Sequence, residues 1–273
     1  MYRRGLSLRA TLKSARMALH SPPDKLIFAP AGSQAHGQAE QFTLGKLHRS
    51  DLNPTSPIAQ FNTWFSQAQK ATTTATTEAE TNQQALVAHP EACTLSTASL
   101  PSGRVTSRVV YLKELDAAGG FVVYSNLSTS RKARDLESNP HAALLFYWEA
   151  LQRQVRVEGV ATRLSKEESQ VYFDTRVRGS RIGAWASRQS QVLESQSGED
   201  DGRAQLEGWV KEVEDKFQGK DDIPVPDFWG GLRIVPSVVE FWQGRESRLH
   251  DRFVYEREEG KADAPWTLQR LSP

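Results

Sequence analysis

One run near the end of the chain combines positive charge with aromatic surface: FWQGRESRLHDRFVY, residues 241–255. Three arginines and a histidine fall within eight positions of it: Arg245, Arg248, His250 and Arg252. Apolar side chains are interleaved with them, among them Trp242, Leu249 and Phe253. A solvated surface rarely mixes the two kinds so closely, whereas a pocket for a flat, anionic, aromatic ligand needs cations and ring faces together. The run therefore indicates a site for such a ligand.

A first group of anion-binding side chains surrounds the start of an expected helix. Arg108 and Lys113 lie five positions apart on one expected strand, and Ser130, Arg131 and Lys132 open the helix over residues 131–138. Free backbone N–H groups and the positive end of the helix dipole favour a phosphate at such a point. We interpret the group as a phosphate cradle. Taken alone, Arg131 and Lys132 are more typical of exposed helix charges.

A second group lies farther along the chain. Tyr172 and Arg176 are four positions apart, so on a helix both project from one face. Ser180 follows on the expected loop, and the three supply a phenol, a guanidinium and a hydroxyl to a separate phosphate. A solvated helix face is the simpler interpretation of this group by itself.

Amides and a histidine extend the candidate site. Gln154 lies within an expected strand, and Gln189 and Ser190 follow the segment IGAWASR; buried amides suit the edge of a heterocycle, although a single Gln is more often exposed. Arg248 and His250 flank one leucine, so on a strand both would face the same side.

Short β-type segments must position these groups. Strands are expected over residues 93–99, 104–113, 121–125, 142–148, 152–163, 232–242, 252–257 and 266–271. Helices are expected over residues 57–69, 131–138 and 204–217, and another from Ser165, where Ser165 and Glu168 form a capping box. Consecutive strands joined by short turns predict an antiparallel sheet closed into a barrel, a mainly β fold with flanking helices.

Composition restricts the function classes. The chain has 273 residues and a net charge of +1, so overall electrostatics does not support nucleic-acid binding. The longest apolar run, residues 142–148, is far below the roughly 18–20 residues of a membrane span. The single Cys93 excludes an internal disulfide and every CxxC metal or redox motif, and no metal is expected. Signatures of dinucleotide, P-loop, hydrolase and zincin sites are also missing.

The amino-terminal segment differs from the rest. Residues 1–40 are interpreted as a tail and residues 41–273 as the folded domain. The first 23 residues hold five basic side chains and no acidic one, which suits either a mitochondrial transit peptide or a simple basic arm, so a cytoplasmic and a mitochondrial location both stay open. The Thr/Ala-rich residues 71–81 are expected to form a surface insertion.

Six segments together resemble the pyridoxine/pyridoxamine 5′-phosphate oxidase family, and its fungal-type branch in particular. They are RVVYLK (108–113), VYSNLSTSRKA (123–133), QRQVRVEG (152–159), RGSRIGAWASRQS (178–190), PDFWGGLRIVP (226–236) and the run at 241–255. The resemblance implies a split β-barrel homodimer with FMN at the subunit interface. It also implies oxidation of pyridoxamine and pyridoxine 5′-phosphate to pyridoxal 5′-phosphate, with O2 reduced to H2O2. Another split-barrel flavin reductase, or a non-catalytic pyridoxal phosphate-binding protein, are the alternatives.

The resemblance also implies residue roles. The FMN contacts would be Arg108, Val109, Val110, Tyr111, Leu112, Lys113, Tyr124, Ser125, Arg131, Lys132, Gln154, Gln189, Ser190, Trp242 and Arg252. The substrate contacts would be Lys113, Tyr172, Arg176, Ser180, Arg248 and His250, with Arg248 and His250 as the catalytic pair. One departure is Val177, where the family usually has proline; this change is expected to loosen the loop that carries Ser180.

Overall fold

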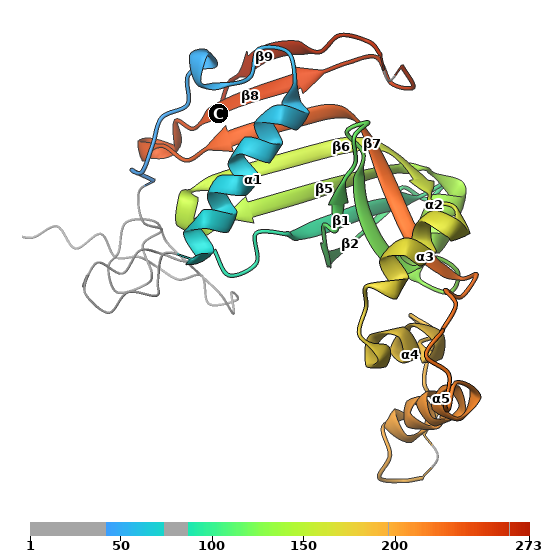
Figure 1. The fold of residues 1–273 in the computed structure, drawn as a ribbon. Helices are drawn as coiled ribbons and strands as arrows, with labels where there is room; N and C mark the ends of the chain where they lie inside the picture. The colour runs from blue at the N-terminus through green and yellow to red at the C-terminus, as the bar shows by residue number, and fades with distance from the viewer. Residues whose placement is uncertain (1–41, 74–86, 196, 262) are drawn as a thin grey trace, which may run out of the picture. The chain divides into compact units, whose positions relative to one another are not determined.

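An antiparallel β-sheet forms the centre of the fold (Figure 1). The computed structural model describes residues 42–73, 87–195, 197–261 and 263–273. The proposed tail with its transit peptide, and most of the Thr/Ala insertion, lie outside these described residues. The strands are β1 (Ala92–Ser99), β2 (Arg104–Tyr111), β3 (Glu114–Leu115), β4 (Phe121–Asn126), β5 (His141–Trp148), β6 (Arg153–Arg163), β7 (Trp229–Gln243), β8 (Asp251–Glu256) and β9 (Thr267–Leu271).

The long strand β7 organises this sheet. The described strands run in the order β2-β1-β5-β6-β7-β4-β3, and β8 and β9 are added beside the second half of β7. The first residues of β7 pair with β4, whereas residues 238–243 pair with β8. Strand β6 pairs along most of β7, and the twisted sheet curls instead of remaining flat (Figure 1). The predicted mainly β fold with flanking helices is confirmed.

A β-bulge in β6 depends on one glycine. The pairing of β6 with β7 shifts register between Glu158 and Gly159. A Cβ at Gly159 would lie 2.0 Å from the carbonyl oxygen of Val235, so no larger residue fits without moving the backbone. Bulges of this kind bend a strand and increase its twist, which lets the sheet close on itself.

Helix α1 (Pro57–Thr73) covers the core of the sheet (Figure 1). Phe61, Trp64 and Ala68 recur at helical spacing and are all buried. The Phe61 ring contacts Phe121 of β4 and Phe146 of β5 with centroids 4.9 and 5.0 Å apart. Burial of a large apolar side chain such as Phe61 stabilises the fold by about 1.5–3 kcal/mol. The predicted helix over residues 57–69 is confirmed, and it continues to Thr73.

Two of the remaining helices begin where they were predicted to begin, and a serine caps each of them. Ser130 accepts a hydrogen bond from the Ala133 N–H at the start of α2 (Arg131–Ser138). Ser165 and Glu168 form the predicted capping box of α3 (Lys166–Asp174). Helix α5 (Arg203–Lys216) agrees with the predicted helix over residues 204–217.

Helix α4 (Arg178–Ala186) was not predicted. The loop assigned to Ser180 is therefore wrong, because Ser180 lies in the first turn of this helix. The segment contains two glycines, and its N-cap residue Val177 makes no capping hydrogen bond through its side chain. Packing holds the helix instead: Ile182 and Ala184 are buried in a second apolar cluster with Phe173.

Short turns complete the described structure. Turns of 3-10 helix occur at Arg49–Asp51, Glu149–Leu151 and Glu246–Arg248. The last of them lies between β7 and β8, in the connection that carries Arg248 and His250, so the strand alternation considered for these two residues does not apply. In the described part of the chain, no helix combines the length and apolar character that a membrane crossing requires.

Candidate active site

A cleft of about 590 Å³ lies between the sheet and helices α2, α3 and α4. Both groups of anion-binding residues predicted from the sequence contribute to its lining. From the first group these are Arg108, Lys113 and Lys132, and from the second Tyr172, Arg176 and Ser180. Two positively charged regions, far apart in the sequence, therefore share one cavity.

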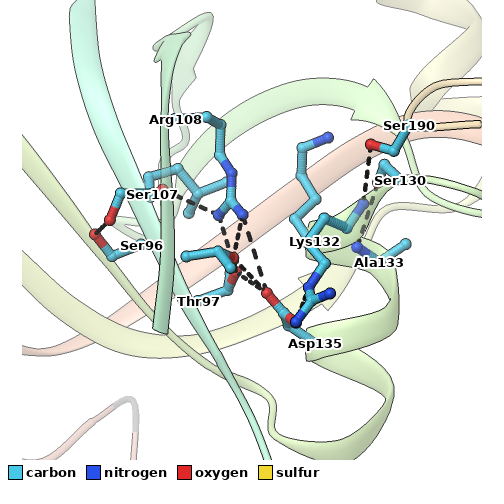
Figure 2. Close-up of polar contacts among 12 residues, drawn as sticks. Ser96, Thr97, Ser107, Arg108, Ser130, Lys132, Ala133, Asp135 and Ser190 are labelled. Atoms are coloured by element: carbon cyan, nitrogen blue, oxygen red, sulfur yellow. Dashed lines mark hydrogen bonds and ion pairs between the residues drawn. The ribbon is translucent and has the colours of Figure 1, made fainter. Parts of the chain in front are cut away.

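The start of α2 forms one side of this cleft, beside β2 (Figure 2). Arg108 donates hydrogen bonds to the hydroxyls of Thr97 and Thr106 and to the Leu95 carbonyl. The ammonium group of Lys132 donates to Oε1 of Gln189 at 2.6 Å. Burial and the neighbouring Arg108 lower the pKa of Lys132 to about 8. A phosphate here would meet a rigid guanidinium and a poorly solvated ammonium group.

Stacked aromatic rings form another side. The rings of Tyr124 and Tyr172 lie 3.9 Å apart at 18°, and Trp229 stacks on Tyr124 at 5.5 Å. Arg176 lies over the Trp229 ring, 4.7 Å from its centroid. Its Nη1 atom is buried and has no hydrogen-bond partner among the described residues. A buried guanidinium donor without an acceptor is the arrangement expected where an anionic ligand binds.

Gln154, Trp242, His250 and Arg252 lie together elsewhere, and we call them the Trp242 group. Gln154 pairs with Trp242 across β6 and β7, and Trp242 pairs with Arg252 across β7 and β8. The His250 ring lies 4.6 Å from that of Trp242. Arg252 donates to both carboxylate oxygens of the buried Glu240. None of these four predicted residues is among those that line the cleft.

The connection that carries Arg248 and His250 is conformationally constrained. Ser247 and Arg248 have φ values of 55° and 62°, a left-handed conformation that costs free energy for residues other than glycine. Nδ1 of His250 accepts the Arg245 N–H at 3.1 Å, which leaves Nε2 as the protonated nitrogen of the neutral ring. Burial and the charge of Arg248 lower the pKa of His250.

Comparison with known families gives two matches in this chain. Residues 79–217 match the model described as pyridoxamine 5′-phosphate oxidase. Residues 229–273 match the model described as the pyridoxine 5′-phosphate oxidase C-terminal dimerisation region. The chain belongs to the pyridoxine/pyridoxamine 5′-phosphate oxidase family. The resemblance inferred from the six sequence segments is thereby confirmed.

Individual relatives agree with the family assignment. The chain is 49% identical over 256 residues to a probable pyridoxamine 5′-phosphate oxidase of Schizosaccharomyces pombe, with 93% of this chain and 97% of that protein covered. It is 47% identical to the pyridoxamine 5′-phosphate oxidase of Saccharomyces cerevisiae, with coverages of 91% and 95%. Among solved structures, PhzG from Burkholderia lata 383 superposes with a TM-score of 0.67 at 28% identity, covering 83% of this chain and 98% of that one. The fold is the split barrel of this oxidase family.

The structure brings most of the FMN contacts implied by the oxidase family to the cleft, but not all of them. Those that line the cleft are Arg108, Val109, Val110, Tyr111, Lys113, Tyr124, Ser125, Lys132 and Gln189. Arg131 and Ser190 do not line it but precede or follow lining residues in the chain, Lys132 and Gln189, and the Arg131 N–H donates to the Ser190 hydroxyl at 3.4 Å. Leu112 is buried in the core. Gln154, Trp242 and Arg252 belong to the Trp242 group, away from the cleft.

Sequence reasoning missed several residues of this oxidase site. Trp229 and Asn126 line the cleft but were not assigned a role. Asn126 Oδ1 accepts the N–H groups of Ser128 and Thr129 and so shapes the loop before α2. Both residues lie in segments that resemble the family, so position within those segments was the available signal. Asp135 was also missed, because an acid in the sequence RKARDLES is typical of an exposed helix face.

Proposed function

We propose that this chain oxidises pyridoxamine 5′-phosphate and pyridoxine 5′-phosphate to pyridoxal 5′-phosphate, with FMN as its cofactor. The observation that carries this function is that one cleft is lined by two separate sets of side chains whose chemistry suits phosphate esters. A flavin mononucleotide and a phosphorylated vitamer each bring one phosphate ester. The names of the fungal relatives support the same activity.

The residues at the start of α2 fit the phosphate of FMN. Arg108 has guanidinium N–H groups beyond those bound to Leu95, Thr97 and Thr106, and Lys132 adds an ammonium group within the same cleft. The positive end of the α2 dipole favours an anion further. Bound FMN would supply the two-electron acceptor for oxidation at the C4′ carbon, and O2 would take up the two electrons and two protons to give H2O2. With pyridoxamine 5′-phosphate, water would then replace the nitrogen, which leaves as ammonia.

The second set of side chains would bind the phosphate of the vitamer. Arg176 offers a buried donor, and the Tyr172 phenol and Ser180 hydroxyl line the same part of the cleft. Binding through this ester would orient the pyridine ring relative to the flavin, which lowers the entropic barrier of a two-molecule reaction. Lys113 lines the cleft as well and is assigned to both ligands.

A second copy of the chain would complete the site. Arg248 and His250 do not line the cleft of their own chain, yet the family assigns them to the substrate. Residues 229–273 match a dimerisation region. Strand β2 lies at the edge of the sheet and exposes Val109 and Tyr111, which are 70% and 46% accessible in the single chain. We therefore propose a homodimer in which Arg248 and His250 of one copy cover the vitamer bound by the other.

Peroxide production tests the proposed function directly. Purified protein reconstituted with FMN and supplied with pyridoxamine 5′-phosphate should form pyridoxal 5′-phosphate and H2O2 in equal amounts. Oxidation of a nicotinamide donor, without action on either vitamer, would instead identify a flavin reductase. Binding of pyridoxal 5′-phosphate without any peroxide would identify a non-catalytic binding protein.

The cellular location is a separate proposal. The basic, acid-free composition of the first 23 residues supports mitochondrial import, and without import the protein would be cytoplasmic. Fusion of these residues to a reporter protein distinguishes the two, since an import signal carries the reporter into mitochondria and a basic arm does not.

A further inference from the structure

Asp135 is a buried acid next to the cleft that no established role explains. It lies on α2 four residues after Arg131, and it is only 1% exposed. A carboxylate at such a position is costly unless charges and hydrogen bonds compensate for the lost water. Its surroundings supply both, from β1, β2 and its own helix (Figure 2).

Two threonine hydroxyls connect Asp135 to Arg108. Oδ2 of Asp135 accepts the hydroxyls of Thr97 at 2.8 Å and Thr106 at 2.6 Å. The same two hydroxyl oxygens accept N–H groups of Arg108, at 2.9 and 2.5 Å. A hydroxyl has one proton to donate, and guanidinium is only a donor, so the direction of each hydrogen bond is fixed. The carboxylate thus orients the hydroxyls, and the hydroxyls hold the guanidinium.

The other carboxylate oxygen holds a second cation. Oδ1 of Asp135 lies 3.3 Å from Nε of Arg131, in the i,i+4 arrangement on α2. Arg108 also approaches Oδ2 directly at 4.0 Å. Although burial raises the pKa of Asp135, the hydrogen bonds from Thr106 and Thr97 and the two arginines lower it overall, so the group is ionised at neutral pH. One negative charge therefore offsets the repulsion between two guanidinium groups.

We propose that Asp135 is a positioning residue, which acts through Thr97 and Thr106 to hold Arg108, and directly to hold Arg131, in the orientation that binds the FMN phosphate. This role presupposes the FMN site of the proposed function. It assigns to Asp135 no contact with the cofactor itself.

Comparison of FMN with riboflavin tests this role, because riboflavin lacks the phosphate. Full-length apoprotein is titrated with each flavin, and the quenching of flavin fluorescence gives the two Kd values. In Asp135→Asn the hydroxyls lose their charged acceptor and both arginines lose their anchor. FMN should bind about tenfold more weakly, as expected for loss of a buried charged hydrogen-bond partner, whereas the riboflavin Kd should change less than about twofold.

A matched pair at Thr106 tests the same connection without removing the acid. Thr106 is partly exposed on the edge strand β2, so its substitution is tolerated even if Asp135→Asn does not fold. Thr106→Val removes the bridging hydroxyl and should also weaken FMN, by a smaller factor. Thr106→Ser keeps the hydroxyl and should restore the wild-type Kd. Asp116→Asn, which breaks the ion pair of Asp116 with Arg233 outside the cleft, should leave both flavin affinities unchanged.

The outcomes separate the positioning role of Asp135 from the existence of the FMN phosphate site. Unchanged or tighter FMN binding in both Asp135→Asn and Thr106→Val would overturn the positioning role, and so would an equal loss of FMN and riboflavin affinity. Failure of the wild-type apoprotein to prefer FMN over riboflavin would instead overturn the phosphate site itself, and the proposed function with it.

Discussion

Tyr172 of α3 stacks on Tyr124 of β4, with their ring centroids 3.9 Å apart and their planes inclined by 18°. This contact joins the helical part of the fold to the sheet at the centre of the cleft. It places the residues proposed for the vitamer phosphate beside the strand proposed for the flavin. The short Tyr124–Glu114 hydrogen bond, 2.6 Å long, fixes the first ring, so the second ring has a rigid surface to pack on.

Arg176→Ala is expected to impair use of phosphorylated substrate selectively. The buried donor of Arg176 would pair with the vitamer phosphate, and a charge-assisted hydrogen bond of this kind is strong in a poorly solvated site. We expect kcat/KM for pyridoxamine 5′-phosphate to fall about 100-fold, while oxidation of unphosphorylated pyridoxamine changes little. Arg163→Ala, on the exposed end of β6, is the control. An equal loss with both substrates would assign Arg176 to folding alone.

Arg131→Ala should weaken retention of FMN. This arginine opens α2 immediately before Lys132, which lines the cleft. Loss of one charged contact to a phosphate typically costs about 1.5–3 kcal/mol, so FMN should be lost on dilution or gel filtration. Arg134→Ala, an exposed arginine on the same helix, is the matched control. Full flavin occupancy in Arg131→Ala would contradict the proposed phosphate cradle.

Lys132 should make FMN affinity dependent on pH. Burial and Arg108 lower its pKa to about 8 in the protein without flavin. A bound phosphate favours the charged ammonium, so FMN should bind most tightly below pH 8, and its Kd should rise above pH 8 by at most about tenfold per pH unit. Lys132→Met should remove this dependence. A wild-type Kd that is constant from pH 7 to pH 9.5 would rule out the role of Lys132.

The lowered pKa of Lys132 should also make the stability of the apoprotein depend on pH. Raising the pH weakens FMN binding but should stabilise the folded apoprotein. The unfolded chain has a lysine pKa of about 10.4, above that of folded Lys132, so between pH 8 and about 10.4 the unfolded state binds more protons. The contribution of this lysine to the free energy of unfolding should therefore increase with pH in that window. Denaturant titrations of wild type and Lys132→Met at pH 7.5 and pH 9.5 measure the difference, which disappears if Lys132 has an ordinary pKa.

Val177→Pro should stabilise the protein without changing its kinetics. Val177 has φ −58° and ψ 147°, a backbone conformation that proline adopts, and among the described residues its N–H donates no hydrogen bond. Proline at such a position reduces the entropy of the unfolded chain, which stabilises by about 0.4–1 kcal/mol and raises Tm by about 1–4 °C. A lower KM for the vitamer would instead agree with the original expectation that valine loosens this segment, and a lowered Tm would show that proline is strained at this position.

Local signals predicted much of this fold. The capping box at Ser165 and Glu168, the apolar spacing of α1 and the alternation in the strands are properties of short segments, and all three agree with the structure. Helix α4 escaped prediction because packing, and not a cap or propensity, stabilises it. The left-handed turn at Arg248 gave no sequence signal, because its left-handed residues are not glycines.

The site was predictable only where its residues lie in recognisable segments. The grouping of Arg108 with Lys132, and of Tyr172 with Arg176, followed from strand and helix geometry. Asp135 could not be found in this way, since its burial depends on Thr97 and Thr106, which lie on strands distant in sequence. The separation of His250 from the cleft was equally hidden, because it depends on how the sheet curls.

Mixing of two inactive variants tests most directly whether the cleft and the Trp242 group form one site across two subunits. Arg248→Ala should lower kcat/KM at least about 100-fold with FMN still bound, and Arg176→Ala impairs the other side of the site. If the subunits exchange and the groups come from different copies, half of the dimers in an equal mixture gain one intact site, and about a quarter of wild-type activity returns. We expect this recovery of H2O2 production. A mixture no more active than either variant, although mass spectrometry detects the mixed dimer, would contradict it.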